Sequence, residues 1–265
     1  MKEIIILNKK EGETPLGALE NFRAKNKKYE NIKMTYAGRL DPLVSGLLLV
    51  LAGEATKEKE KYLKLSKEYK FKILFGFATD TFDILGKVIL SRRILDMDKK
   101  ELGKSIQKNL QFFRGEFMQS YPMYSSKPVA GKPLFAHARA GRVVKSPKHK
   151  VKVMSLKFLS IGAISRKKLL ENIERRIAKV KGPARNAKNI AFAGGDFRQK
   201  EILKIWREKL AKGGGERFFT ADFHIKCGSG TYVRAIANDL GKRMRTPSLA
   251  LSIKRTKIGK WSRTP

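Results

Sequence analysis

The chain has little cysteine, little histidine and no long hydrophobic run. Its single cysteine, Cys227, excludes a disulfide within the chain, and the three scattered histidines lack the spacing of metal ligands. The longest apolar stretch, Leu47–Ala52, is too short to span a bilayer. The apolar segment at the N-terminus is brief and contains Glu3, which is not typical of a signal peptide. We therefore expect no metal, no redox chemistry, no membrane span and a cytoplasmic location.

Acidic residues are also few, and positive charge dominates. There are 59 Lys and Arg residues against 24 Asp and Glu residues, so the formal net charge is +35 over 265 residues. This excess is far beyond what solubility requires, and a polyanion is its natural counterpart. Nucleic acid is favoured over a membrane. With 42% hydrophobic residues and no long Pro- or Ser-rich linker, residues 1–265 are expected to form a single domain.

The apolar pattern predicts strands and helices that mix without a strict βαβ rhythm. Alternating apolar residues predict strands at Glu3–Leu7, Tyr69–Phe77, Val151–Ile161 and Phe219–Cys227. Helical spacing extends from Leu16 to Phe22, entered through Thr14 and Pro15, and from Val233 to Met244, entered at Thr231. This mixture predicts an α+β fold with a mixed, largely antiparallel sheet flanked by helices.

Residues 163–218 form a more basic segment with its own organisation. It contains sixteen Lys and Arg residues and six Asp and Glu residues, a net charge of +10 (16 − 6). Two apolar repeats at helical spacing follow each other, the first on Leu170, Ile173, Ile177 and Val180 and the second on Ile202, Ile205, Trp206 and Leu210. We predict a basic helical hairpin inserted between two strands. Its lysines are either simply solvated or part of an arm that binds phosphates, and the sequence favours neither.

One acidic residue lies in a turn directly before the apolar run. The string from Tyr36 to Gly46 reads YAGRLDPLVSG. An Asp-Pro pair alone usually marks a turn or a helix N-cap, because Asp bonds nearby backbone N–H groups and Pro fixes φ. The whole string, however, resembles the loop of the TruB-type tRNA pseudouridine synthases, G-x-L-D-P-x-A-x-G-x-L, which carries an aspartate nucleophile. The resemblance places Asp41 on that aspartate.

Three further stretches resemble the same family, in the family's order. The strand that begins at Glu68 and continues into GFATDTFDILGKV is similar to the K-x-Y strand, and it puts Tyr69 on the active-site tyrosine. Residues 116–150, with PMYSSKPVAGKPL and ARAG, resemble the flexible thumb that closes on the RNA loop. The stretch CGSGTYVRAIANDLG is similar to the strand, turn and helix that bring an arginine to the aspartate, and Arg234 takes that place. Four ordered matches indicate a site, although each residue alone has an ordinary structural explanation.

The resemblance implies a pseudouridine synthase fold and a reaction that needs no cofactor. Uridine becomes pseudouridine when the N-glycosidic bond breaks, the base turns and its C5 joins the sugar, with no net redox change. Arg234 would keep Asp41 ionised and oriented. Tyr69 would offer a flat face to the base and a hydroxyl for the C5 proton. The expected substrate is the tRNA T-loop, with uridine 55 flipped out of its stack.

The same resemblance implies a set of substrate-binding residues, which are Tyr36, Tyr69, Tyr232, Ile253, Lys127, Lys132 and Arg139. Tyr232 and Ile253 would line the base pocket, and the thumb cations would contact phosphates. Tyr36 stands where bacterial members commonly carry a histidine that wedges into the RNA loop, and a tyrosine ring can stack in the same way.

The matched region spans about Ile4 to Ser262, outside the inserted hairpin. We expect a compact form without the family's C-terminal PUA domain, in which the hairpin partly replaces that domain by contacting tRNA. Guide-RNA-dependent relatives also use a PUA domain, so its expected absence argues for action on tRNA without a guide RNA. We also expect a monomer. The alternative is a catalytically inactive RNA-binding or RNA-folding protein on the same scaffold. Binding alone needs no carboxylate facing an anionic ligand, so Asp41 favours the enzyme. A glycosidase is a weaker reading, because it would normally need two acids.

Overall fold

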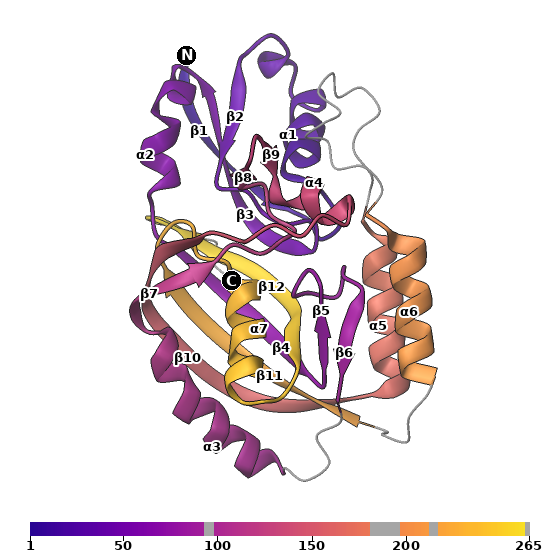
Figure 1. Cartoon of the computed structure of the whole chain (residues 1–265). Helices are drawn as coiled ribbons and strands as arrows, with labels where there is room; N and C mark the ends of the chain where they lie inside the picture. Colours follow the sequence, from indigo (N-terminus) through magenta and orange to yellow (C-terminus); the bar gives the residue numbers. More distant parts are fainter. Residues whose placement is uncertain (93–97, 181–196, 212–216, 263–265) are drawn as a thin grey trace.

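A curved, nine-stranded sheet organises the computed structural model, which describes residues 1–92, 98–180, 197–211 and 217–262 (Figure 1). Seven strands lie side by side in the order β1 (Lys2–Lys9), β3 (Val44–Gly53), β12 (Ser248–Ile258), β4 (Lys67–Phe75), β11 (Arg217–Cys227), β10 (Lys148–Ser165) and β7 (Gly115–Ser120). Two more pair at the side of this path, β2 (Met34–Ala37) with β3 and β13 (Trp261–Ser262) with β12. The β12–β3 pair is parallel and the other pairs are antiparallel, which confirms the predicted mixed, largely antiparallel sheet.

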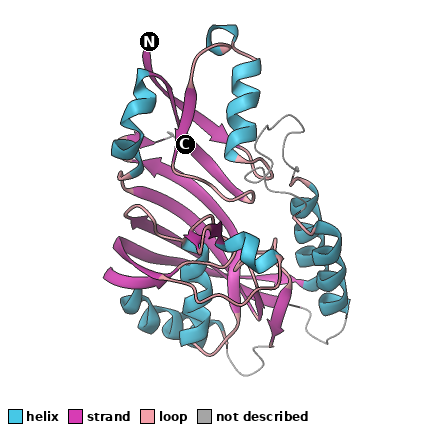
Figure 2. Cartoon of the chain, turned by 45° about the horizontal axis from the view of Figure 1, so that its top comes forward, coloured by secondary structure: helices cyan, strands magenta, loops and turns pink. Residues whose placement is uncertain are grey.

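Helices and short hairpins surround this sheet (Figure 2). The α-helices are α1 (Pro15–Ala24), α2 (Lys59–Leu63), α3 (Lys99–Leu110), α4 (Leu134–Arg139), α5 (Arg166–Ala178), α6 (Gln199–Ala211) and α7 (Val233–Arg243). Short 3-10 helices occupy Lys27–Tyr29, Glu54–Glu58 and Gln111–Phe113. Two-stranded sheets are formed by β5 (Phe77–Thr79) with β6 (Val88–Ser91) and by β8 (Pro128–Val129) with β9 (Lys132–Pro133). Within the described ranges, no helix has both the length and the apolar composition needed to cross a membrane.

Two main apolar clusters lie on opposite faces of the central strands. On β4, Tyr69, Phe71, Ile73 and Phe75 belong to one cluster, together with residues of α3 and α7. The neighbouring Leu74 belongs to the other cluster, which contains the buried residues of α5 and α6. Because side chains alternate along a strand, α3 with α7 and α5 with α6 cover different faces of the sheet.

The predicted elements are present, with two local corrections. Thr14 caps α1 as predicted, since its side chain accepts a hydrogen bond from the Gly17 N–H at 3.0 Å. The N-cap position of α7 is Tyr232, whose side chain makes no capping hydrogen bond, and not Thr231, whose hydroxyl donates to the Gly228 carbonyl at 3.1 Å. The prediction that Phe77 shares the face of Tyr69 is wrong. The strand β4 ends at Phe75, and Gly76, with a φ of +101°, redirects the chain. Phe77 then packs 5.2 Å from the Trp206 ring in the other cluster.

The basic hairpin follows β10 and precedes β11, as predicted. Ser165 caps α5, and β10 and β11 pair up to Ser165 and Arg217, so the strands extend further than the predicted boundaries at 163 and 218. The apolar stripe of α5 also differs slightly, because Leu169 is fully buried and Leu170 only partly. In α6 the fully buried residues are Ile202, Trp206 and Leu210. The connections at 181–196 and 212–216 lie outside the described residues.

Candidate active site

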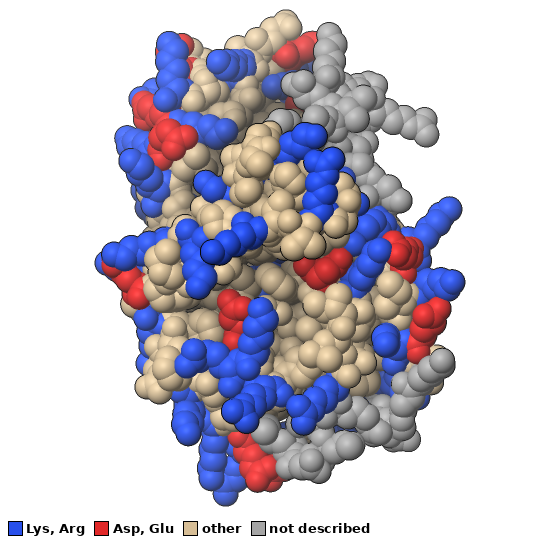
Figure 3. All heavy atoms as spheres, in the orientation of Figure 1, with Lys and Arg blue, Asp and Glu red and all other residues tan. Residues whose placement is uncertain are grey.

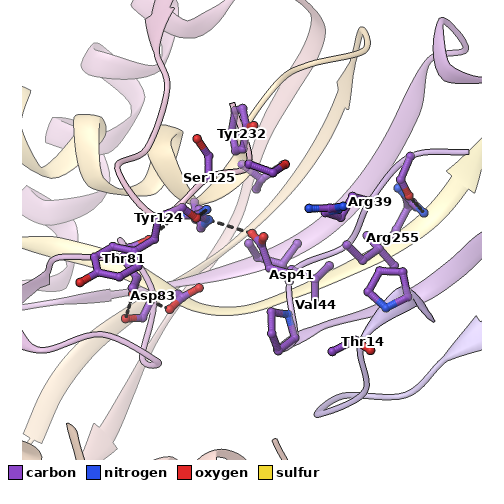
Figure 4. A pocket seen from close by; sticks show the side chains of 18 of the residues that line it. Thr14, Arg39, Asp41, Val44, Thr81, Asp83, Tyr124, Ser125, Tyr232 and Arg255 are labelled. Atoms are coloured by element: carbon purple, nitrogen blue, oxygen red, sulfur yellow. Dashed lines mark hydrogen bonds and ion pairs between the residues drawn. The ribbon is translucent and has the colours of Figure 1, made fainter. Parts of the chain in front are cut away.

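A cavity of about 670 Å³ opens where four segments meet. These are the loop between β2 and β3, the N-terminus of α7, residues 124–126 of the thumb segment and residues 197–198 before α6. Figure 4 shows Asp41 in this cavity, with Asp83 on one side and Arg255 on the other. The sequence therefore brings together residues that are more than 190 positions apart.

Hydrogen bonds to the carbonyls of Asp41 and Pro42 fix the backbone of the Asp41 loop. The Asp41 carbonyl accepts the Val44 N–H at 3.0 Å, and the Pro42 carbonyl accepts the Gly12 N–H at 2.9 Å. The fully buried Lys9 donates from Nζ to the Pro42 carbonyl at 3.1 Å. Burial lowers the pKa of Lys9 to about 8, against the opposing effect of nearby acids. The backbone of this loop is fixed, while the Asp41 side chain stays 34% exposed toward the cavity.

Arg234 holds the Asp41 carboxylate from the other side. Its Nε lies 2.8 Å from Asp41 Oδ2, and only 3% of the arginine side chain is exposed. Nη1 donates to the Thr81 carbonyl at 2.5 Å and Nη2 to the Tyr124 carbonyl at 2.9 Å. Burial would lower the pKa of Arg234, but Asp41 and Asp83 outweigh it and raise that pKa. The guanidinium is thus charged and fixed on three sides, and the Asp41–Arg234 contact expected from the resemblance is present.

Asp83 is a second carboxylate at the cavity, and the sequence analysis gave it no role. Its Oδ1 accepts hydrogen bonds from the Thr81 hydroxyl at 2.7 Å and from the Leu85 N–H at 2.9 Å. Burial raises the pKa of Asp83 to about 6, and the charge of Asp41 adds to this while Arg234 opposes it. The sequence did carry a signal for this local structure, the close spacing of Thr81, Asp83 and Leu85. An Asp side chain readily accepts a hydrogen bond from the backbone N–H two residues further on.

Tyr69 and Ile253 line the sheet side of the cavity on neighbouring strands. Tyr69 is 9% exposed, and both Tyr69 and Arg255 line the cavity. Burial raises the pKa of Tyr69, so its phenol stays protonated at neutral pH. Ile253 pairs with Val44 across the parallel β12–β3 contact, close to the Asp41 loop.

The other predicted substrate-binding residues divide into two groups. Tyr36, Tyr232 and Arg139 line the cavity. Lys127 and Lys132 lie on the thumb segment outside the lining, with Lys127 Nζ 5.4 Å from the centre of the Tyr121 ring. Lys and Arg side chains outnumber acidic ones over the face shown in Figure 3. The arrangement suits an anionic ligand that covers the cavity and extends beyond it.

Two buried cations beside the cavity were also missed. Arg255 is 1% exposed and donates to the carbonyls of Leu47 at 2.7 Å and Gly38 at 3.1 Å. Burial, together with the charge of Arg255, lowers the pKa of Lys67 to about 8. No sequence pattern distinguishes these two residues from the many exposed Lys and Arg residues. In the described part of the chain, no three His, Cys, Asp or Glu side chains gather as a metal site would require.

Comparison with known proteins identifies the family. The model of the TruB family pseudouridylate synthase N-terminal domain matches residues 25–183, more than half of the chain. The tRNA pseudouridine synthase B of Lactobacillus acidophilus is 29% identical over 252 residues, which cover 95% of this chain and 67% of that protein. The enzyme of the same name from Wigglesworthia glossinidia brevipalpis is 30% identical over 257 residues, covering 96% and 59%.

A similar fold occurs in a solved structure. The crystal structure of a Cbf5-Nop10-Gar1 complex contains a chain that matches 98% of this one with a TM-score of 0.54 and 16% identity. Half of that chain is covered. This chain therefore spans about half to two thirds of the length of the proteins it matches here.

Proposed function

The chain belongs to the TruB family of pseudouridylate synthases, and we propose that it converts a uridine of the tRNA T-loop, expected at position 55, to pseudouridine. The observation that carries the proposal is the Asp41 carboxylate, which is exposed to a cavity and fixed at 2.8 Å by a buried arginine. A carboxylate in this position is directed and accessible, as a nucleophile must be.

In the proposed reaction Asp41 acts on the sugar. An oxygen of its carboxylate bonds C1′ while the C1′–N1 bond breaks and the uracil leaves with the bonding electrons. The detached base turns in the cavity, its C5 attacks C1′, and the carboxylate leaves again. A base then takes the proton from C5, and N1, which kept the electrons of the broken bond, takes up a proton, so that the aromatic base is restored. Atoms and electrons balance without any cofactor.

The other residues of the cavity have supporting roles in this proposal. Arg234 pairs with the Asp41 carboxylate and fixes its direction. Tyr69 provides an aromatic face for the base. Its raised pKa speaks against a phenolate as the base for the C5 proton, so a role in that step requires a relay through the neutral hydroxyl. Tyr232 and Ile253 complete the wall around the base.

Substrate RNA must reach this cavity with its target base unstacked. We propose base flipping, which costs a few kcal/mol that pocket contacts offset. Tyr36 at the rim would stack in the RNA loop, and Lys127, Lys132 and Arg139 would contact phosphates. The exposed lysines on the outside of α5 and α6 would contact tRNA beyond the T-loop. We further propose that the protein acts as a cytoplasmic monomer and without a guide RNA.

Tritium release tests the proposal directly. A tRNA transcript labelled at uridine C5 releases tritium when pseudouridine forms, and the wild-type chain is compared with Asp41→Ala and Asp41→Asn. We expect release with the wild type and none with either variant, while all three proteins bind the transcript. If the wild type binds tRNA tightly but releases no tritium, the protein is a non-catalytic RNA binder on the same scaffold.

A further inference from the structure

The start of α6 contacts both segments that hold Arg234. Arg198, directly before α6, pairs with Asp80 through Nη1 at 2.7 Å and Nη2 at 3.4 Å. Its guanidinium carbon also lies 4.3 Å from the centre of the Tyr124 ring. Asp80 precedes Thr81, and the carbonyls of Thr81 and Tyr124 are the two backbone acceptors of the Arg234 guanidinium. Arg198 thus contacts both segments whose carbonyls accept hydrogen bonds from Arg234.

The backbone of Arg198 supports a positioning role. Its φ is +59°, a left-handed conformation that residues other than glycine rarely adopt. Such strain persists only where the surroundings fix it, and it clusters at functional sites. The Arg198–Asp80 pair is also well shielded, with side-chain exposures of 19% and 21%. Further along α6, Trp206 Nε1 donates to the Ile84 carbonyl at 3.1 Å and so holds the same segment a second time.

Helix α5 makes the matching contacts on the Asp41 side. Arg176 is 4% exposed, and its Nε and Nη2 donate to Glu11 Oε2 at 3.0 Å and 2.7 Å. The next residue, Gly12, donates its N–H to the Pro42 carbonyl. A Cβ on Gly12 would lie 2.2 Å from the backbone oxygen of Lys179, at the end of α5. Leu43, two residues after Asp41, packs in the apolar cluster of α5 and α6.

From these contacts we propose that the hairpin positions the active site. Helix α5 fixes the Asp41 loop, and α6 fixes the segments of Thr81 and Tyr124, whose carbonyls hold Arg234. We call this role of the hairpin the brace. Figure 1 shows both helices packed beside β5 and β6, next to the segment that contains Asp80. Arg198 is then a positioning residue and contacts no reacting atom. The catalytic part of this inference rests on the proposed function. Its structural part, that Arg198 restrains two loops, stands separately.

The test compares Arg198→Gln with a matched variant of the same hairpin, Arg207→Gln. Arg207 pairs with Glu174 at 2.6 Å between α5 and α6, but it is 60% exposed and lies outside the cavity. We expect Arg198→Gln to lower kcat for pseudouridine formation about 10- to 100-fold, with KM within about threefold of the wild type. Arg207→Gln should leave kcat unchanged. Arg198→Lys, which keeps the charge without the fork, should recover part of kcat.

A cycle with Asp80→Asn isolates the pair. Because Arg198 is proposed to act through Asp80, the double variant should lose no more kcat than Arg198→Gln alone. A raised KM and a reduced salt dependence of tRNA binding at unchanged kcat would overturn the brace and make Arg198 an RNA contact. Equal kcat in the wild type and Arg198→Gln would overturn it as well.

Amide hydrogen exchange tests the restraint without any activity. Peptides covering residues 79–85 and 122–126 should exchange faster in Arg198→Gln than in the wild type, and should be unchanged in Arg207→Gln. If the wild type forms no pseudouridine but this difference is present, the proposed function fails and the restraint survives. If exchange in both peptides is the same in all three proteins, the brace is refuted whatever the activity.

Discussion

Replacing Arg234 with lysine keeps the positive charge at the site and removes only its geometry. In the wild type, three guanidinium nitrogens serve Asp41 and the carbonyls of Thr81 and Tyr124. A lysine ammonium occupies one point and can retain the contact with Asp41 alone. Two buried carbonyls then lose their donors, at about 1–3 kcal/mol each. Because the adjoining cavity admits water, we take the lower part of this range and expect a loss of about 2–3 kcal/mol in the free energy of unfolding.

Urea denaturation at neutral pH measures this loss, with Arg243→Lys as the control. Arg243 is on the same helix but exposed, and it stacks on Phe112. Arg243→Lys should change stability by less than about 0.5 kcal/mol. Tritium release should fall about 100-fold in Arg234→Lys, because Asp41 is no longer held in one direction. A stability within about 0.5 kcal/mol of the wild type would refute the assignment of three directed hydrogen bonds, whatever the activity.

Three further predictions concern ionisation, backbone space and RNA binding. Asp83 has its pKa raised from 3.8 to about 6, so its contribution to stability is present below pH 4 and is lost as the pH rises through 6. Relative to Asp83→Asn, the wild type should therefore lose about 3 kcal/mol between pH 3 and 7 in urea titrations, and a constant difference would contradict this. Gly46→Ala should cost about 3 kcal/mol or more, because φ is +108° and the new Cβ would lie 2.1 Å from the Arg255 carbonyl oxygen. Gly115→Ala, with φ +71° and open space around it, should lower the free energy of unfolding by only about 1 kcal/mol. Thermal unfolding of both glycine variants measures the difference. The logarithm of tRNA affinity should fall with the logarithm of salt concentration with a slope of about −0.7 per phosphate contacted, and a flat titration would remove the phosphate contacts from the proposal.

Local patterns predicted most of the fold because most elements here obey one simple rule each. Alternation predicted β11, and Thr14 with Pro15 predicted where α1 begins. The failure at Phe77 has a tertiary cause. Alternation continues through Gly76 in the sequence, but a positive φ at that glycine ends the strand. Strand order was also out of reach, since the parallel β12–β3 contact joins segments about 200 residues apart.

The candidate site was predicted where the sequence carries extended motifs and missed where single residues fold into place. Asp41 and Arg234 were paired through two long motif matches, and the structure puts them in contact. Arg198 and Arg255 belong to no such motif. In a chain with 59 Lys and Arg residues, neither charge nor hydrophobicity separates a cavity arginine from a surface one. Only the three-dimensional arrangement shows that Arg198 reaches Asp80.

In a protein with this much positive charge, bound phosphates compete with Asp41 for Arg234, and the burial of Arg234 limits this competition. A protein with a net charge of +35 that binds RNA exposes its arginines to phosphates, which compete with carboxylates for the same guanidinium fork. At the site, Arg234 is 3% exposed and its donors already serve Asp41, Thr81 and Tyr124. A phosphate therefore cannot bind two nitrogens of this guanidinium without breaking a buried hydrogen bond to the Thr81 or Tyr124 carbonyl. In the proposed function the exposed cations attract the RNA backbone, whereas the buried Arg234 keeps the Asp41 carboxylate directed at the cavity.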